Sequence, residues 1–431
     1  MITMTFPRQV ARILVVFFMP IAVSVVCPAQ TADPTAVELS NRVEKLQKEL
    51  EELQTQLATL KTSPPPSTIA ASQMAAPVAT SNSAPSISSL LGPTSLSGFV
   101  DMYYSYNANQ PASRTSSFRS FDAFSNQFAL NLVELTVDKA PEATNSRTGY
   151  HLSLGYGQAI NAVNGTEPGG LSFAQYLKEA YFSYLAPVGK GLQVDLGKFV
   201  TPAGAEVIET KDNWNYSRGL LFSYAIPYYH FGIRAKYAFN DKYSLTGYVV
   251  NGWNNLVENN TGKTYGMSLG WNVTKKISVT QNYMAGPEQA SNSNWRQLWD
   301  TVITYSPTSR LSLMANSDYG RGDRLAGVVH PVYWTGLAGY VKYAFNDKYA
   351  VATRYEYYDD HDGFTTGTAQ NFNGVTGTFQ RAIASHILTR LEFRRDMSNR
   401  PTFVKGNNVP ALAQNTATAG LVFMLDSREA R

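Results

Sequence analysis

The sequence predicts an all-β fold, a transmembrane antiparallel β-barrel of about 16 strands, preceded by a coiled-coil helix and a linker rich in Pro, Ala and Ser. Three observations support this prediction. From Leu96 onward, segments of about ten residues alternate apolar and polar side chains. The connections between them alternate between short and long. No segment after the N-terminus is apolar over about 18 consecutive residues, which excludes spanning helices.

Residues 265–273 show the alternation most clearly. Tyr265, Met267, Leu269, Trp271 and Val273 share one face, while glycines and small polar residues occupy the other. Residues 231–239 repeat the pattern. Strands of about 9–11 residues cross a bilayer at a tilt, and only a closed barrel pairs every backbone group there.

The alternating segments can be counted, and we expect sixteen strands. An even number is usual for bacterial single-chain barrels. The expected ranges are 96–107, 127–138, 148–157, 175–186, 191–201, 227–239, 242–252, 263–273, 276–285, 296–306, 309–319, 331–345, 349–359, 373–382, 386–397 and 414–426.

Tight connections follow the even-numbered strands, for example at residues 240–241 and 346–348. The same string, KYAFNDKY, spans residues 236–243 and 342–349, so we expect one hairpin conformation at both places. Short turns on one rim place both ends of the barrel there, on the periplasmic side. One strand changes phase: Leu130 and Leu132 do not match Val133, Leu135 and Val137, which predicts a bulge.

The composition excludes other classes. Only 16% of the 431 residues are charged, 12% are aromatic, and the formal net charge of +4 is too small for a nucleic-acid partner. The chain has five histidines without an HExxH or His-x-His pattern, so we expect no enzyme, cofactor or metal. His361, within residues 359–362 (DDHD), is interpreted as part of a solvated loop.

The N-terminus predicts export. Arg8 and Arg12 precede an apolar stretch, and Cys27-Pro28-Ala29 follows, so residues 1–29 are interpreted as a signal peptide cleaved after Ala29. Val26 disfavours the alternative of a lipoprotein anchored at Cys27. A mature chain without cysteine has no disulfide and no thiolate site.

Residues 30–61 carry an apolar stripe at coiled-coil spacing, in the periplasm. An unpaired stripe needs a partner helix, so we expect an oligomer and favour a homotrimer; the spacing itself does not separate dimer from trimer. The alternative is a helix that lies on the barrel or the membrane. The stripe is formed by Ala36, Leu39, Val43, Leu46, Leu50, Leu53, Leu57 and Leu60.

Residues 62–95 form a low-complexity linker, and residues 96–431 form the barrel. The linker either spaces the coiled coil from the barrel or reaches toward the peptidoglycan, and the sequence leaves both open.

The connection Thr201–Ile226 is the third long loop, the segment that enters the lumen in sixteen-stranded porins. Its charged residues would lie at a constriction, opposite charges on the wall, and set ion preference. The alternative is that these charges only pair with one another. The loop candidates are Glu206, Glu209, Lys211, Asp212 and Arg218, and the wall candidates are Arg234, Lys236, Arg354, Glu356, Arg390, Glu392 and Arg394.

Four strings carry a family resemblance: residues 197–202 (GKFVTP), 212–218 (DNWNYSR), 227–234 (PYYHFGIR) and 250–255 (VNGWNN). They resemble the OmpL-like beta-barrel porin family, from about Leu96 to the end. The resemblance implies an outer-membrane barrel, contact with lipid, and passive transport of small hydrophilic solutes or ions. The coiled coil before a barrel is similar, more weakly, to phosphate-selective porins. The chain departs from many such barrels because Phe423 is not terminal.

Two alternatives to a general diffusion porin stay open. One is an anion-selective or phosphate-selective channel. The other is an envelope-anchoring or adhesive protein, suggested by the coiled coil and the linker. An enzyme with a Ser/His or Asp/His pair at the rim of the lumen is the least favoured hypothesis.

Overall fold

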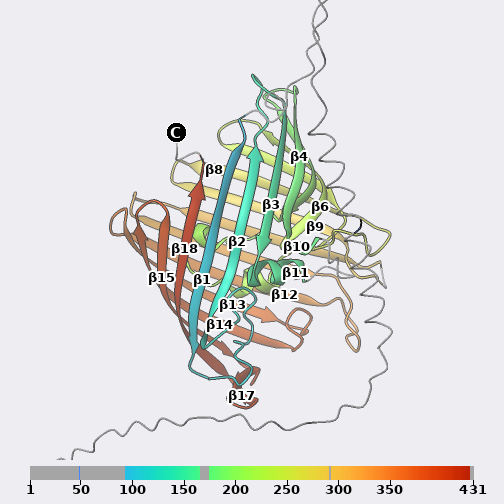
Figure 1. The fold of residues 1–431 in the computed structure, drawn as a ribbon. Helices are drawn as coiled ribbons and strands as arrows, with labels where there is room; N and C mark the ends of the chain where they lie inside the picture. The colour runs from blue at the N-terminus through green and yellow to red at the C-terminus, as the bar shows by residue number, and fades with distance from the viewer. Residues whose placement is uncertain (1–47, 49–92, 166–173, 291–292, 428–431) are drawn as a thin grey trace, which may run out of the picture. The chain divides into compact units, whose positions relative to one another are not determined.

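The computed structural model describes residue 48 and residues 93–165, 174–290 and 293–427 (Figure 1). The signal peptide, the coiled coil apart from Lys48, and all but the end of the linker lie outside the described residues. The chain divides into two units, Met1–Asn82 and Ser83–Arg431, and the strands belong to the second unit.

A closed antiparallel barrel of sixteen strands forms this second unit, as predicted (Figure 1). Each strand pairs with its neighbour along the chain, and β1 closes the ring against β18. The strands are β1 (Ser95–Asn107), β2 (Gln127–Lys139), β3 (Thr148–Tyr156), β4 (Leu177–Ala186), β5 (Leu192–Val200), β6 (Tyr229–Ala238), β7 (Tyr243–Val250), β8 (Thr264–Thr274), β9 (Ile277–Pro287), β10 (Trp295–Tyr305), β11 (Leu311–Arg321), β12 (Tyr333–Ala344), β13 (Tyr349–Asp360), β14 (Gln370–Ile383), β15 (Ile387–Ser398) and β18 (Ala413–Asp426).

Other elements lie in the long connections. A helix, α3 (Gln158–Asn164), follows β3, and a small hairpin, β16 (Phe403–Lys405) with β17 (Val409–Ala411), follows β15. The third loop, residues 201–228, contains η2 (Thr210–Asp212) and η3 (Leu221–Ala225). None of the helices among the described residues is long and apolar enough to cross a membrane.

The two ends of the barrel meet at one rim, which we call the short-turn rim. The Leu96 backbone N–H donates to Ser427 Oγ at 3.0 Å. The repeated string forms the same turn twice: Asn240 Oδ1 and Asn346 Oδ1 each accept bonds from the backbone N–H groups two and three residues later. An Asn side chain that replaces a backbone acceptor in this way is typical of a tight turn.

The predicted alternation is confirmed. The outward residues of β8 are exposed, with Tyr265 and Met267 each 50% exposed on the side that faces lipid. The predicted bulge is also present, because the register between β1 and β2 shifts at Asp101/Met102 and leaves Asn131 unpaired in the ladder. Inward side chains, by contrast, are largely buried, since the long loops fold against them.

Candidate functional site

The third loop lies inside the barrel, between the strand walls. Its ends are joined by a backbone hydrogen bond from Thr201 N–H to Tyr228 O at 3.0 Å. Leu220, Leu221 and Phe222 are buried, and Phe222 contacts Phe121 of the first loop, residues 108–126, with ring centroids 5.4 Å apart. Burial of this apolar segment favours an inward loop over a solvated one.

Tyr216 attaches the loop to β1. Its hydroxyl donates to Asp101 Oδ1 at 2.8 Å, and Thr210 also donates to the Asp101 carboxylate. Asn131, at the bulge in β2, completes the set of donors around Asp101. The Tyr216 ring lies against Gly420 of β18, where an added Cβ would come within 2.3 Å of a ring carbon. The sequence therefore keeps this wall free of a side chain where the loop crosses it.

Arg354 attaches the loop to β13, on another part of the wall. Its Nη1 donates to Glu206 Oε1 and to the Ser217 carbonyl, both at 2.6 Å. Glu392 of β15 accepts the backbone N–H groups of Tyr216 at 2.6 Å and Ser217 at 3.0 Å. These contacts orient both the side chains and the backbone of the loop.

Two further arginines of β15 bind the loop through its carbonyl groups. Arg390 donates to the carbonyls of Thr210 and Asn213, and Arg394 donates to the Arg218 carbonyl at 2.7 Å. Arg218 in turn stacks on the Phe121 ring, 4.8 Å from its centroid. A planar guanidinium presents several donors at once, which suits it to fixing a loop backbone.

A chain of buried ion pairs continues from the third loop to the first. Arg394 Nε lies 2.7 Å from Asp396 Oδ1, and Asp396 Oδ2 lies 3.2 Å from Arg119 of the first loop. Arg119 also pairs with Asp122 at 2.7 Å. Both inward loops are thus held on one wall, β13 to β15, by alternating charges.

The electrostatics of the loop are dominated by burial. Burial raises the pKa of the Glu206 carboxyl, and the Arg354 guanidinium opposes that rise. Burial also raises the pKa of Tyr224 to about 12. A buried charge pair recovers its desolvation cost only when further hydrogen bonds satisfy it, as Ser217 and Glu356 do around Arg354.

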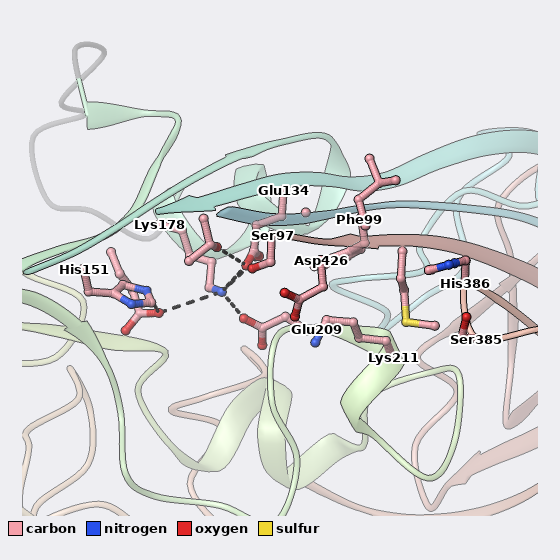
Figure 2. A pocket seen from close by; sticks show the side chains of 15 residues that line it. Ser97, Phe99, Glu134, His151, Lys178, Glu209, Lys211, Ser385, His386 and Asp426 are labelled. Carbon is pink, nitrogen blue, oxygen red and sulfur yellow. Dashed lines mark hydrogen bonds and ion pairs between the residues drawn. The ribbon is translucent and has the colours of Figure 1, made fainter. Parts of the chain in front are cut away.

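A cavity of about 300 Å³ lies toward the short-turn rim, beside η2 (Figure 2). Lys178 of β4 stands at its side, between Glu134 and Glu209 (Figure 2). It pairs with the carboxylates of both and with that of Glu179. The ammonium group therefore links the third loop to β2 and β4. Three carboxylates around one lysine leave this cavity wall negative.

His151 extends the acidic wall toward β3. Its Nδ1 lies 2.9 Å from Asp138 Oδ1, and its Nε2 lies 3.5 Å from Glu179 Oε2. Lys211 reaches the cavity from the loop, with Nζ 5.7 Å from the Phe99 ring centroid. The cavity is thus lined by both the loop and the wall.

Comparison with known proteins decides the family. The model of the family described as "Putative beta-barrel porin-2, OmpL-like" matches residues 93–425, more than half of the chain. The chain belongs to this family. No curated protein sequence matches it.

Solved structures of outer-membrane proteins share the porin's fold. An anion-selective porin from Comamonas acidovorans is 11% identical, with a TM-score of 0.52, covering 77% of this chain and 99% of that one. OmpT of Vibrio cholerae in a trimer form has the same identity, coverage and TM-score. Identities this low establish the barrel fold alone.

The charged residues predicted from the sequence fall into two groups: those that meet in one buried network, and those that lie outside it. Glu206, Arg218, Arg354, Glu356, Arg390, Glu392 and Arg394 come together in the buried network of the loop and the β13–β15 wall. Glu209 pairs with Lys178, while Lys211 and Asp212 pair with each other at 2.6 Å and stay partly exposed. Arg234 pairs with Asp195 of β5 at 2.7 Å, and Lys236 is exposed.

Sequence reasoning missed three residues that attach the third loop outside β13 and β15: Asp101 on β1, Lys178 on β4, and Tyr216 in the loop itself. Asp101, Lys178 and Tyr216 each make contacts between segments far apart in the chain, such as Tyr216 with Asp101, 115 residues apart. The available signal was the alternation itself, because Asp101 occupies an inward position of β1 between Phe99 and Tyr103. A charge in an inward position of a strand beside a long loop is a candidate for loop attachment. The predicted oligomerisation stripe from Leu39 to Leu60 lies outside the described residues.

Proposed function

We propose that this porin is a passive diffusion channel for small hydrophilic solutes or ions, with the third loop as the constriction of its lumen. The supporting observation is the attachment of that loop to β1, β13 and β15 through Asp101, Arg354 and Arg390. A sixteen-stranded barrel is wide enough for an aqueous channel. A loop that is fixed at several points inside the lumen narrows the path of solutes and ions through the barrel.

Purified protein in planar bilayers tests the conductance. We expect stepwise current increases, and folded protein that gives none would refute the channel. The loop is tested with a thiol reagent in a Cys27→Ser chain, which otherwise lacks cysteine. A charged methanethiosulfonate applied to Asp212→Cys should lower conductance, because residue 212 is exposed on the loop.

Asp241→Cys is the matched control, because Asp241 lies exposed in a short turn between β6 and β7. Its modification should leave conductance unchanged. Equal conductance losses at residues 212 and 241, or none at residue 212, would place the loop outside the conducting path.

Selectivity for anions or phosphate is the alternative within this function. The four arginines of the buried network, Arg218, Arg354, Arg390 and Arg394, bind loop carbonyls or carboxylates and are at most 3% exposed, so they are not free to attract anions. Reversal potentials in a salt gradient decide between the two hypotheses. A marked anion preference would favour the alternative.

We also propose a homotrimer, based on the apolar stripe of residues 36–60 and on the trimer form of one solved structure of the same fold. Leu50→Lys would place an ammonium group from each chain on the helix seam, where desolvation and repulsion oppose association. The native mass in mild detergent should therefore fall for Leu50→Lys. A monomeric mass for the unchanged chain would refute the trimer.

A further inference from the structure

Two carboxylates lie side by side on the inner wall near the start of the third loop. Asp300 of β10 and Asp318 of β11 are directly opposite each other in the antiparallel register, and both point inward. Opposed residues on one face of a sheet have Cβ atoms about 5 Å apart. Asp300 is 0% exposed and Asp318 is 1% exposed, so water screens neither charge.

The two carboxylates differ in their hydrogen bonds. Asp300 accepts from both neighbouring strands: Asn282 Nδ2 lies 2.6 Å from its Oδ2, and Asn316 Nδ2 lies 2.7 Å from its Oδ1. Neither oxygen of Asp318 has a hydrogen-bond partner among the described residues. A buried acceptor without a donor carries its full desolvation cost, so these two oxygens require an explanation.

The pair is not compensated by a basic side chain within residues 93–165, 174–290 and 293–427, where none of the ion pairs includes Asp300 or Asp318. A single proton shared by the two carboxylates would leave one charge and one unpartnered oxygen. A divalent cation would neutralise both charges and would bind both oxygens of Asp318.

Further buried oxygens on β7 and β9 lack partners in the described part of the chain. Asn282 Oδ1 and Tyr248 Oη are both buried and without a hydrogen bond. The Tyr248 ring extends from β7 across Gly266 of β8, where an added Cβ would come within 2.1 Å of the ring. The Tyr248 hydroxyl therefore lies over β8, beyond its own strand. Carboxylate, amide and hydroxyl oxygens are the ligands that hard divalent cations prefer.

We propose that Asp300 and Asp318 bind one divalent cation of the Ca²⁺ and Mg²⁺ class, with Asn282 as a supporting ligand. The site would lock the start of the third loop to the wall. Asn282 Nδ2 also donates to the Pro202 carbonyl at 3.1 Å, and Ala205 N–H donates to Asn316 Oδ1 at 3.3 Å. The side-chain amides of Asn282 and Asn316 therefore bind both the Asp300 carboxylate and the loop backbone. A cation that fixes the carboxylate also fixes the start of the loop.

The test uses the chain refolded in detergent without lipopolysaccharide, so that no lipid phosphate competes for cations. We expect one Ca²⁺ per chain by calorimetry, luminescence of bound Tb³⁺ excited through tyrosine, and a higher unfolding temperature in Ca²⁺ than in EDTA. Asp318→Asn should weaken Ca²⁺ binding by about 100-fold or more, because it removes a ligand charge. Asp300→Asn is a second variant if the first does not fold.

Asp195→Asn is the matched control, since Asp195 is also inward and buried but is paired with Arg234. It should bind Ca²⁺ like the unchanged chain. The proposal is overturned if the unchanged chain binds none of Ca²⁺, Mg²⁺ and Tb³⁺, or if Asp318→Asn binds them equally well. A proton shared by the pair would appear as a pH-dependent stability that Ca²⁺ does not alter and Asp318→Asn removes, which also refutes the cation site.

Discussion

Arg354 of β13 and Glu206 of the third loop form a buried ion pair, with Nη1 2.6 Å from Oε1 and side chains 0% and 4% exposed. The same guanidinium binds Glu356 through Nε at 2.8 Å. A pair of this kind adds little net stability, because desolvation offsets the Coulomb attraction. Removing one partner, however, leaves the other charge buried and uncompensated, which lowers the free energy of unfolding. The pair therefore favours the loop position in which Glu206 meets Arg354.

Arg354→Met should destabilise the barrel by about 3–5 kcal/mol, because it leaves the Glu206 carboxylate buried without its cation and leaves Glu356 with the more distant Arg394 alone. The free energy of unfolding is measured by urea titration in detergent. The double variant Arg354→Met/Glu206→Gln should lose less than the single one, since it removes one of the uncompensated charges. Arg324→Met, in the exposed loop after β11, is the control and should change stability by less than about 0.5 kcal/mol. A double variant less stable than Arg354→Met would contradict the pairing.

The strands of the barrel wall could be predicted from the sequence. The contacts that the loops make inside the lumen could be predicted only in part. Each strand has lipid on one side and water or a polar loop on the other, so apolar and polar side chains alternate with a period of two, as in residues 265–273. This alternation predicts the number of strands, and its change of phase predicts the bulge near Asn131. Alternation also showed that Arg354 and Arg394 point inward. It contains no information on which loop atom each one meets, because Glu206 and Arg354 are 148 residues apart.

Gly420→Leu should displace the third loop. An added Cβ there would come within 2.3 Å of a Tyr216 ring carbon, and the Tyr216 side chain is already fully buried. Loss of the Tyr216 bond to Asp101 should then increase current noise in single-channel recordings and cost about 1–3 kcal/mol in urea unfolding. Gly377→Leu is the control on the outward face of β14, where an added Cβ meets nothing within 4 Å and cannot reach the loop. Equal current noise in both variants would show that the contact between Gly420 and the Tyr216 ring does not determine the position of the third loop.

Glu288, just after β9, should make the long-loop rim sensitive to pH. Burial raises the pKa of Glu288 from 4.5 to about 7, with Arg296 opposing. The folded state then binds more protons than the unfolded state between these values, so stability is full below pH 4.5 and falls as pH rises through 7. The loss is about 3 kcal/mol for the whole shift. Urea titrations between pH 4 and pH 8 measure it.

Glu288→Gln should abolish this slope, because its amide keeps the acceptor for the Trp253 and Thr264 donors without a titrating charge. Glu258→Gln, a change of the same kind at a less buried loop carboxylate paired with Lys263, should retain the slope. A slope that survives in Glu288→Gln would assign the titration to another group.

Neutralising the accessible acids of the third loop should shift ion preference toward anions. Glu209 and Asp212 are suited to this test, with side chains 16% and 53% exposed, whereas Glu206 is committed to Arg354. In Glu209→Gln/Asp212→Asn, Lys178 and Lys211 remain, so the local potential becomes more positive while the width of the pore hardly changes. The reversal potential in a KCl gradient should move accordingly, and the shift should shrink near 1 M salt, where the Debye length is about 3 Å. Asp241→Asn, in a short turn, should leave the potential unchanged. An unaltered reversal potential in the folded double variant would mean that permeating ions do not pass near η2, and that the loop charges act only to position the loop.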